Sequence, residues 1–155
     1  MKRLAVALAV ALAFALACTG ALAGAWGDGS FENDDAMDWV GDCVQAVSPG
    51  VVKAAFDRVL NADVAEAPDA SAAIAAAEVV AASLGKPSPA LPANLKAWLA
   101  GQPRAQIAAQ AALAERALTK IEDARHSELR QLWSEGKANQ WLTKVQALQS
   151  RIGSK

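Results

Sequence analysis

The sequence predicts an all-α fold, a compact bundle of about six to seven short helices that follows an N-terminal signal segment. Apolar residues recur at steps of three and four along most of the chain, which is the spacing of one helix face. Proline and glycine separate these stretches, and no run rich in Val, Ile and Thr alternates with polar residues as a strand would. We expect one signal segment over residues 1–23 and one helical domain over residues 24–155.

The first 23 residues have the pattern of an export signal. Lys2 and Arg3 form a short positive start, residues 4–17 are an unbroken apolar run, and Ala21-Leu22-Ala23 is a pattern that signal peptidase recognises. We therefore expect cleavage after Ala23 and a periplasmic or secreted mature protein. Two alternatives stay open, a signal retained as a membrane anchor and a lipidated Cys18. Membrane contact is expected only in those two cases.

The first three helices of the mature chain have clear start signals. After a glycine-rich entry loop at residues 24–30, Asn33 is a good N-cap for the first helix. Ser48-Pro49 starts a second helix that ends near Asn61. The third helix, over about residues 69–84, is rich in alanine and apolar on nearly every side. It is therefore expected to be the buried central helix.

Four more helices follow, each opened by a proline or a capping residue and most closed by a glycine. In order, they are expected from Pro92 to Gly101, from Pro103 to about Ile121, from Ser127 to Gly136 and from Asn139 to Gly153. Alanine gives little burial per residue, so a few large side chains must anchor the core. The expected anchors are Trp26, Trp39, Phe56, Trp98, Trp133 and Trp141. Cys43 shares the stripe of the first helix and is expected to be a buried, inert thiol.

Charge is divided unevenly along the mature chain. Residues 24–78 carry 11 acidic and 2 basic side chains, whereas residues 79–155 carry 5 acidic and 11 basic ones. Together the two halves have a net charge of −3, which excludes a protein that binds nucleic acid through an overall positive charge. Two interpretations remain: the acidic half folds against the basic half, or the acidic part meets a cation or a basic partner.

The densest acidic group surrounds the start of the first helix, and Glu32, Asp34, Asp35 and Asp38 are the candidate binding residues. Oxygen ligands at this density could bind Ca²⁺ or Mg²⁺, although the spacing is not that of an EF-hand loop. The alternative is that Asp34 and Asp35 complement the helix dipole while the other carboxylates are solvated. We assign no metal and no cofactor on this pattern.

Two further residues are candidates for chemistry or for structure. Glu78 is the only charged residue between Asp69 and Lys86, midway along the most apolar helix. A carboxylate there needs a cation if it is buried, and we expect a structural ion pair with Arg130. His126 is the only histidine and is expected to be exposed. No catalytic residues are assigned.

The residues that open the mature chain carry a family resemblance. Residues 24–39 contain the pattern W-G-x-G-x-F-E-N-D-D-A-x-D-W, which resembles a small bacterial family, domain of unknown function family 4259. The segments at residues 75–81, 127–133 and 141–152 are similar to that family as well. The signal segment is an addition to the family pattern. The resemblance implies a compact helical domain and supplies no activity or catalytic residue.

The preferred functional interpretation is an exported, non-catalytic domain that binds another envelope or secreted protein. Its basis is an acidic region without a credible catalytic set. The first alternative is divalent-cation binding through the acidic residues at the start of the first helix. The second is an enzyme that uses Glu78 or His126 in a pocket.

Overall fold

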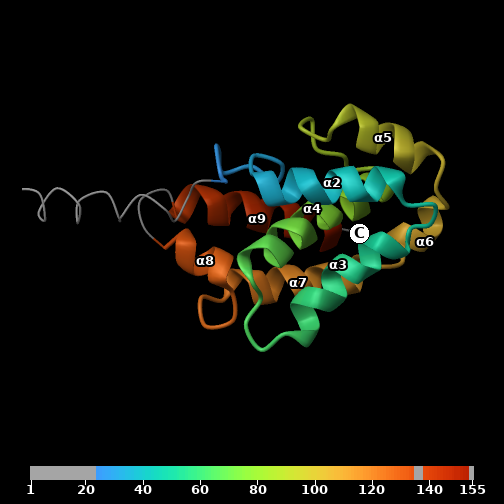
Figure 1. The fold of residues 1–155 in the computed structure, drawn as a ribbon. Coiled ribbons are helices and arrows are strands. Elements are labelled where there is room, and N and C mark those ends of the chain that lie inside the picture. The colour runs from blue at the N-terminus through green and yellow to red at the C-terminus, as the bar shows by residue number, and fades with distance from the viewer. Residues whose placement is uncertain (1–23, 135–137, 154–155) are drawn as a thin grey trace, which may run out of the picture.

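A computed structural model describes residues 24–134 and 138–153, in which the fold is all-α (Figure 1). The expected signal segment, with Cys18 and the cleavage position, lies outside the described residues, as does Gly136. The described helices are α2 (Asp34–Gln45), α3 (Gly50–Asn61), α4 (Ala67–Ser83), α5 (Ala93–Ala100), α6 (Arg104–Ala108), α7 (Ala111–Glu122), α8 (Glu128–Leu132) and α9 (Ala138–Gly153). Within the described ranges no strand forms, and no helix is long and apolar enough to cross a membrane.

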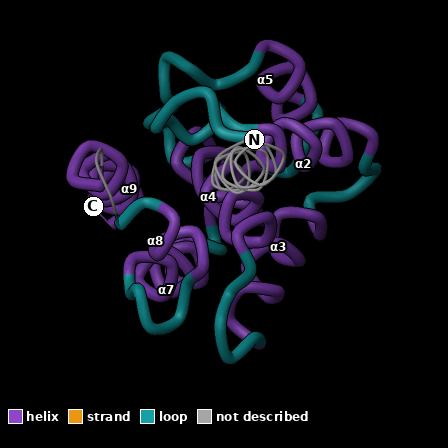
Figure 2. Tube along the Cα trace, turned by 60° about the vertical axis from the view of Figure 1, so that its left-hand side comes forward, coloured by secondary structure: helices purple, strands orange, loops and turns teal. Residues whose placement is uncertain are grey.

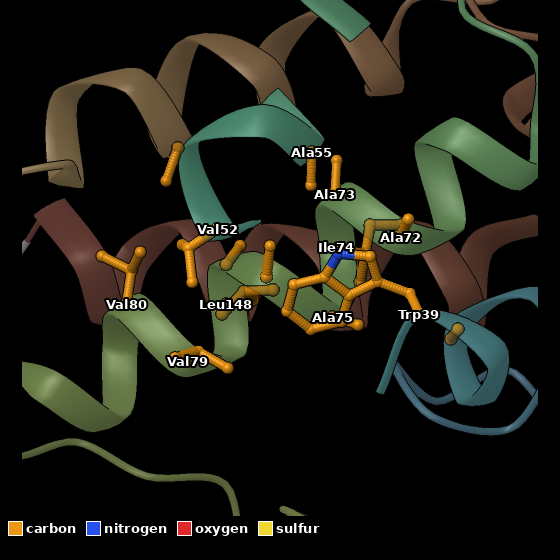
Figure 3. Close-up of a cluster of buried hydrophobic side chains, with 14 of the residues drawn as sticks. Trp39, Val52, Ala55, Ala72, Ala73, Ile74, Ala75, Val79, Val80 and Leu148 are labelled. Atoms are coloured by element: carbon orange, nitrogen blue, oxygen red, sulfur yellow. The ribbon is translucent and has the colours of Figure 1, made fainter. Parts of the chain in front are cut away.

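Helix α4 is the centre of the structure, as its all-round apolar sequence predicts. It contacts α2, α3 and α5 to α9, and Figure 2 shows it enclosed between α2, α3, α7 and α9. Every residue from 70 to 82 is buried. Alanine makes this possible, because its small side chain lets neighbouring helices approach from all sides. Figure 3 shows alanines of α4 beside Val52 and Ala55 of α3 and Leu148 of α9.

The large side chains that anchor this core agree with the sequence-based list except at Trp26. Five members are buried: Trp39, Phe56, Trp98, Trp133 and Trp141. Trp26 was expected in the core, but 62% of it is exposed. The prediction is wrong because the entry loop folds back on itself and places Phe31, which is 8% exposed, in the core instead.

The helix ends follow the local signals in the sequence. The Asn33 side chain caps α2 by accepting a hydrogen bond from the Ala36 N–H at 2.8 Å, and the Ser127 hydroxyl caps α8 in the same way. Gly85 follows α4 with a φ of +85°, a left-handed conformation that glycine adopts without strain. There its N–H donates to the Ala82 carbonyl, and the Lys86 N–H donates to the Ala81 carbonyl. These bonds satisfy carbonyls that the end of the helix leaves without partners.

The expected helix from Pro103 to Ile121 is divided in two. The chain turns at residues 109–110 between α6 and α7, although the spacing of apolar residues runs through this point. Ile107 of α6 and Leu118 of α7 are both fully buried. The turn lets the short α6 pack on one part of α4, while α7 packs against α3, α4 and α9 together. Tertiary packing therefore overrides a continuous local pattern.

Cys43 is fully buried on α2, and burial raises the pKa of its thiol to about 12. We expect the native domain at pH 8 to react with Ellman's reagent at least about 100-fold more slowly than the unfolded domain, because the thiolate is the reacting species. The rate of absorbance increase with and without guanidinium measures this ratio. Rapid stoichiometric labelling of the folded protein would show that the thiol is accessible and ionised.

Candidate functional site

Four exposed carboxylates gather where the entry loop meets α2. We call them the acidic face; they are Glu32, Asp34, Asp35 and Asp38. Within the described residues none of the four forms an ion pair. The structure thus brings the four predicted residues to one end of α2, where Lys144, paired with Asp28, is close enough to Glu32 to interact with its charge.

The entry loop that presents the acidic face is held by backbone hydrogen bonds. The Glu32 carbonyl accepts from the N–H groups of Trp26 and Gly27 at 3.0 and 3.2 Å, and the Asp34 N–H donates to the Gly24 carbonyl at 2.8 Å. The Glu32 carboxylate turns back to accept the Gly29 N–H at 2.7 Å. A side chain at position 27 would collide with Glu32. The glycines of the loop therefore let the chain close tightly around this carboxylate.

On the acidic face, the charged form of the Asp35 carboxylate is less favoured than that of a free aspartate. Its pKa is raised, first by partial burial and then by the negative charges of Asp38 and Asp34. Asp34 and Asp35 also lie in the first turn of α2, where the positive end of the helix dipole favours carboxylates. A cation that approached Asp35 would relieve the repulsion between these side chains.

A small cavity lies between the entry loop, α4, α8 and α9. Its volume is about 90 Å³, and its lining includes Gly24, Asp35, Ser71, Ile74, Trp133 and Trp141. The two tryptophan rings stack with centroids 6.2 Å apart and planes 7° from parallel. Pockets for drug-sized ligands or cofactors usually have about 300–1,000 Å³. The cavity therefore suits a small group or a single side chain.

Glu78 lies close to this region, and its ion-pair partner differs from the prediction. Glu78 is 3% exposed, and its Oε1 accepts hydrogen bonds from Arg151 at 2.7 Å and from the Ser30 hydroxyl at 2.8 Å. The predicted pairing with Arg130 is wrong. Arg130 belongs to α8, where its guanidinium lies 3.5 Å from the Trp133 carbonyl oxygen. Glu78 faces α9 and the entry loop instead, so it connects the two ends of the described chain to α4.

A sequence signal for Arg151 exists in the pattern of α9. Arg151 follows the buried Leu148 by three residues and precedes the buried Ile152, so it lies at the edge of the apolar face of the helix. A basic residue at such an edge can bury its stem and reach an internal carboxylate. The pattern marks Arg151 as a helix-edge residue but does not identify its partner, because Glu78 lies 73 residues away in the sequence.

The two charged halves of the chain meet only in part. Between the parts of the two halves that the structure describes, ion pairs form from Lys144 to Asp28 at 2.7 Å and from Arg151 to Glu78 at 2.7 Å. The acidic face contributes to neither pair. Folding of the acidic half against the basic half therefore accounts for these two pairs, and a cation or basic partner for the acidic face stays a prediction.

The described side chains do not form a recognisable metal-binding group. Across residues 24–134 and 138–153, no three His, Cys, Asp or Glu side chains converge as ligands of one ion would. Glu32 is directed to the Gly29 N–H, while the three aspartates follow the surface of a helix turn. A cation bound at this end of α2 would have to take most of its ligands from water.

His126 lies elsewhere, at an open cavity of about 800 Å³ that is also lined by Glu115, Lys120 and Asp123. Its Nδ1 is 3.2 Å from the Asp63 backbone carbonyl oxygen. The neighbouring Arg125 hydrogen-bonds to Asp123 and holds the pKa of that carboxyl well below its usual range. The ring of His126 thus contacts a backbone carbonyl, while the Asp123 carboxylate in the same cavity is held by Arg125.

Comparison with known proteins gives one match. The model of a family described as domain of unknown function (DUF4259) matches residues 24–144. The matched range includes the entry loop, the acidic face and Glu78, and it ends before Arg151. Neither a curated protein nor a solved structure matches the chain.

Proposed function

This chain belongs to the DUF4259 family, and we propose that it is an exported, non-catalytic domain that binds a basic region of another envelope or secreted protein through its acidic face. The observation that carries the proposal is the set of exposed, unpaired carboxylates on an ordered support. The Asn33 cap and the bond from Gly29 to Glu32 fix the backbone beneath them. A preformed charged surface loses little conformational entropy when a partner binds.

The exposed side chain of Trp26 favours a protein over a free ion as the partner of the acidic face. Its side chain is 62% exposed, and its backbone pairs directly with that of Glu32. An exposed tryptophan beside charged groups is typical of residues that dominate binding energy at protein interfaces. A basic peptide segment could place a cation near Asp35 and an apolar stem against this ring.

The candidate catalytic groups favour a binding role over catalysis. Glu78 is held by two hydrogen bonds to Oε1 inside the protein, and Cys43 is buried with a raised pKa. His126 meets a backbone carbonyl rather than an orienting carboxylate. The Ser30 hydroxyl lies within hydrogen-bond reach of Glu78, but the same Glu78 oxygen is paired with Arg151, which favours a structural role for this carboxylate over that of a general base.

Quantitative capture from envelope extracts tests the proposal. The bait is the mature domain, compared with the variant Asp35→Asn/Asp38→Asn. We expect basic proteins to be recovered by the wild type and reduced at least about tenfold by the variant, because losing two interfacial charges costs about 1.4 kcal/mol or more. Raising the salt concentration should weaken recovery in the same way.

The matched control is Asp63→Asn/Glu66→Gln, which removes two exposed carboxylates outside the acidic face and changes the net charge equally. This control should recover the same proteins as the wild type. Equal recovery by all three baits, or loss in the control alone, would contradict the proposed role of the acidic face.

A further inference from the structure

We propose that the acidic face also contains a binding site for the chain's own mature N-terminus, in which Asp34 holds the α-ammonium group of Gly24. This inference rests on one part of the proposed function, export with cleavage between Ala23 and Gly24. It does not depend on any partner protein. The group bound is a primary ammonium that exists only after the signal has been removed.

The geometry of Gly24 supports this pairing. Its carbonyl accepts the Asp34 N–H at 2.8 Å, which fixes the residue beside the start of α2. A β-carbon built on Gly24 would lie 3.5 Å from Oδ2 of Asp34. In a chain that begins at Gly24, rotation about the bond between the α-carbon and the carbonyl carbon can bring the nitrogen to that same position, because the N–Cα bond is about as long, ~1.5 Å. An ammonium there is within ion-pair reach of Asp34.

The charges around this position favour an ammonium. The positive end of the α2 dipole, about half a unit charge, opposes it, but Asp34 and Asp35 together bring two negative charges. Asp35 lines the same cavity as Gly24, and α4, α8 and α9 contribute only uncharged residues to the lining. Asp35 also has a raised pKa, so a neighbouring cation would stabilise its charged form.

Ser71 gives a second, independent indication that the cavity accepts a polar group. It projects from α4, is 2% exposed and lines the cavity with Gly24. No hydrogen bond joins its hydroxyl to another described residue, although the residue as a whole is almost fully enclosed, so the hydroxyl can bond a group inside the cavity. The hydroxyl can accept a hydrogen bond from an ammonium or from a water that the ammonium holds.

Removal of the signal would thus create a positive charge at Gly24 that pairs with Asp34 of the acidic face. In the precursor the Gly24 nitrogen is a neutral amide attached to Ala23, so neither its charge nor its rotation is available. After cleavage the new cation pairs with Asp34 and secures the end of the entry loop. The folded mature domain should be more stable than the same domain with its terminal charge removed.

Titration of the Gly24 α-proton shifts by NMR tests the pairing in protein that begins at Gly24. An unperturbed α-amino group has a pKa of about 7.7–8.0, and an opposite charge nearby raises it. We expect a rise of about 0.5–1 unit, abolished by Asp34→Asn and largely retained in Asp38→Asn. A pKa within the unperturbed range, or one that Asp34→Asn leaves unchanged, would overturn the inference.

Melting temperatures give a second readout that needs no variant. Protein beginning at Gly24 should melt higher than its N-acetylated form or a form that retains Ala23. Because the folded pKa is raised, the difference should be full below pH 7 and vanish as the pH rises through that pKa. Equal melting at pH 6.5 would overturn the inference. Sequencing of the exported protein must show Gly24 as its first residue, and another start would overturn it as well.

These outcomes are separate from those that test partner binding. Failure of the N-terminal pairing leaves the dependence of capture on Asp35 and Asp38 intact. Conversely, a raised pKa at Gly24 can be observed in a domain that captures no partner at all. If N-acetylation strengthens capture while the Gly24 pKa stays unperturbed, the cavity receives the partner's lysine instead, and the proposed self-pairing is wrong.

Discussion

Arg151→Met lowers the free energy of unfolding by about 3 kcal/mol, because it leaves the buried Glu78 carboxylate without a cation. Removing one partner of a buried ion pair costs about 3–5 kcal/mol in general. The lower end applies here, since the Arg151 side chain is 30% exposed and that of Glu78 only 4%. The variant also loses the hydrogen bond from Arg151 to the Lys86 carbonyl. Urea unfolding followed by tryptophan fluorescence measures the change.

The control for this prediction is Arg130→Met, which tests the pairing that the sequence suggested. Because Arg130 makes no ion pair with Glu78, we expect a change within about 0.5 kcal/mol. The double variant Glu78→Leu/Arg151→Met should recover part of the lost stability, since an apolar pair leaves no buried charge. A larger loss in Arg130→Met than in Arg151→Met would contradict the observed arrangement.

Phe56→Ala has the second large expected effect, a loss of about 3–5 kcal/mol. Phe56 of α3 is fully buried against a core in which alanine supplies most of the positions of α4. A core of small side chains has few groups that can move into the space left by a ring, so the cavity remains. Thermal and urea unfolding should both show the loss.

Trp26→Ala is the matched aromatic control. The sequence predicts both Trp26 and Phe56 as core anchors. In the structure, however, Trp26 is 62% exposed and Phe56 is 0% exposed. Removing the Trp26 ring should change stability by no more than about 0.5 kcal/mol. Equal destabilisation by the two substitutions would mean that Trp26 packs in solution as firmly as Phe56.

The features that sequence reasoning predicted are those that local chemistry determines. The Asn33 and Ser127 caps, the end of α4 at Gly85 and the buried alanine helix each depend on a short stretch of chain. The grouping of the acidic face is local as well, because its four residues lie within seven positions. Capping, turn and burial preferences operate over that distance.

The features that were missed depend on contacts between distant segments. Arg151 lies 73 residues from Glu78, so the spacing along the chain carries no sign of their pairing. Whether Trp26 or Phe31 enters the core is decided by how the entry loop folds back, since both are aromatic residues next to glycine or serine. The turn between α6 and α7 arises from packing on α4. These outcomes require the fold as well as the sequence.

Hydrogen–deuterium exchange of the mature domain, with and without a captured partner, tests the central claim most directly because it locates the binding surface. The account predicts added protection in residues 24–42, which contain the entry loop and the acidic face, and little change elsewhere. Protection centred instead on residues 111–126, beside His126, with residues 24–42 unaffected, would contradict it.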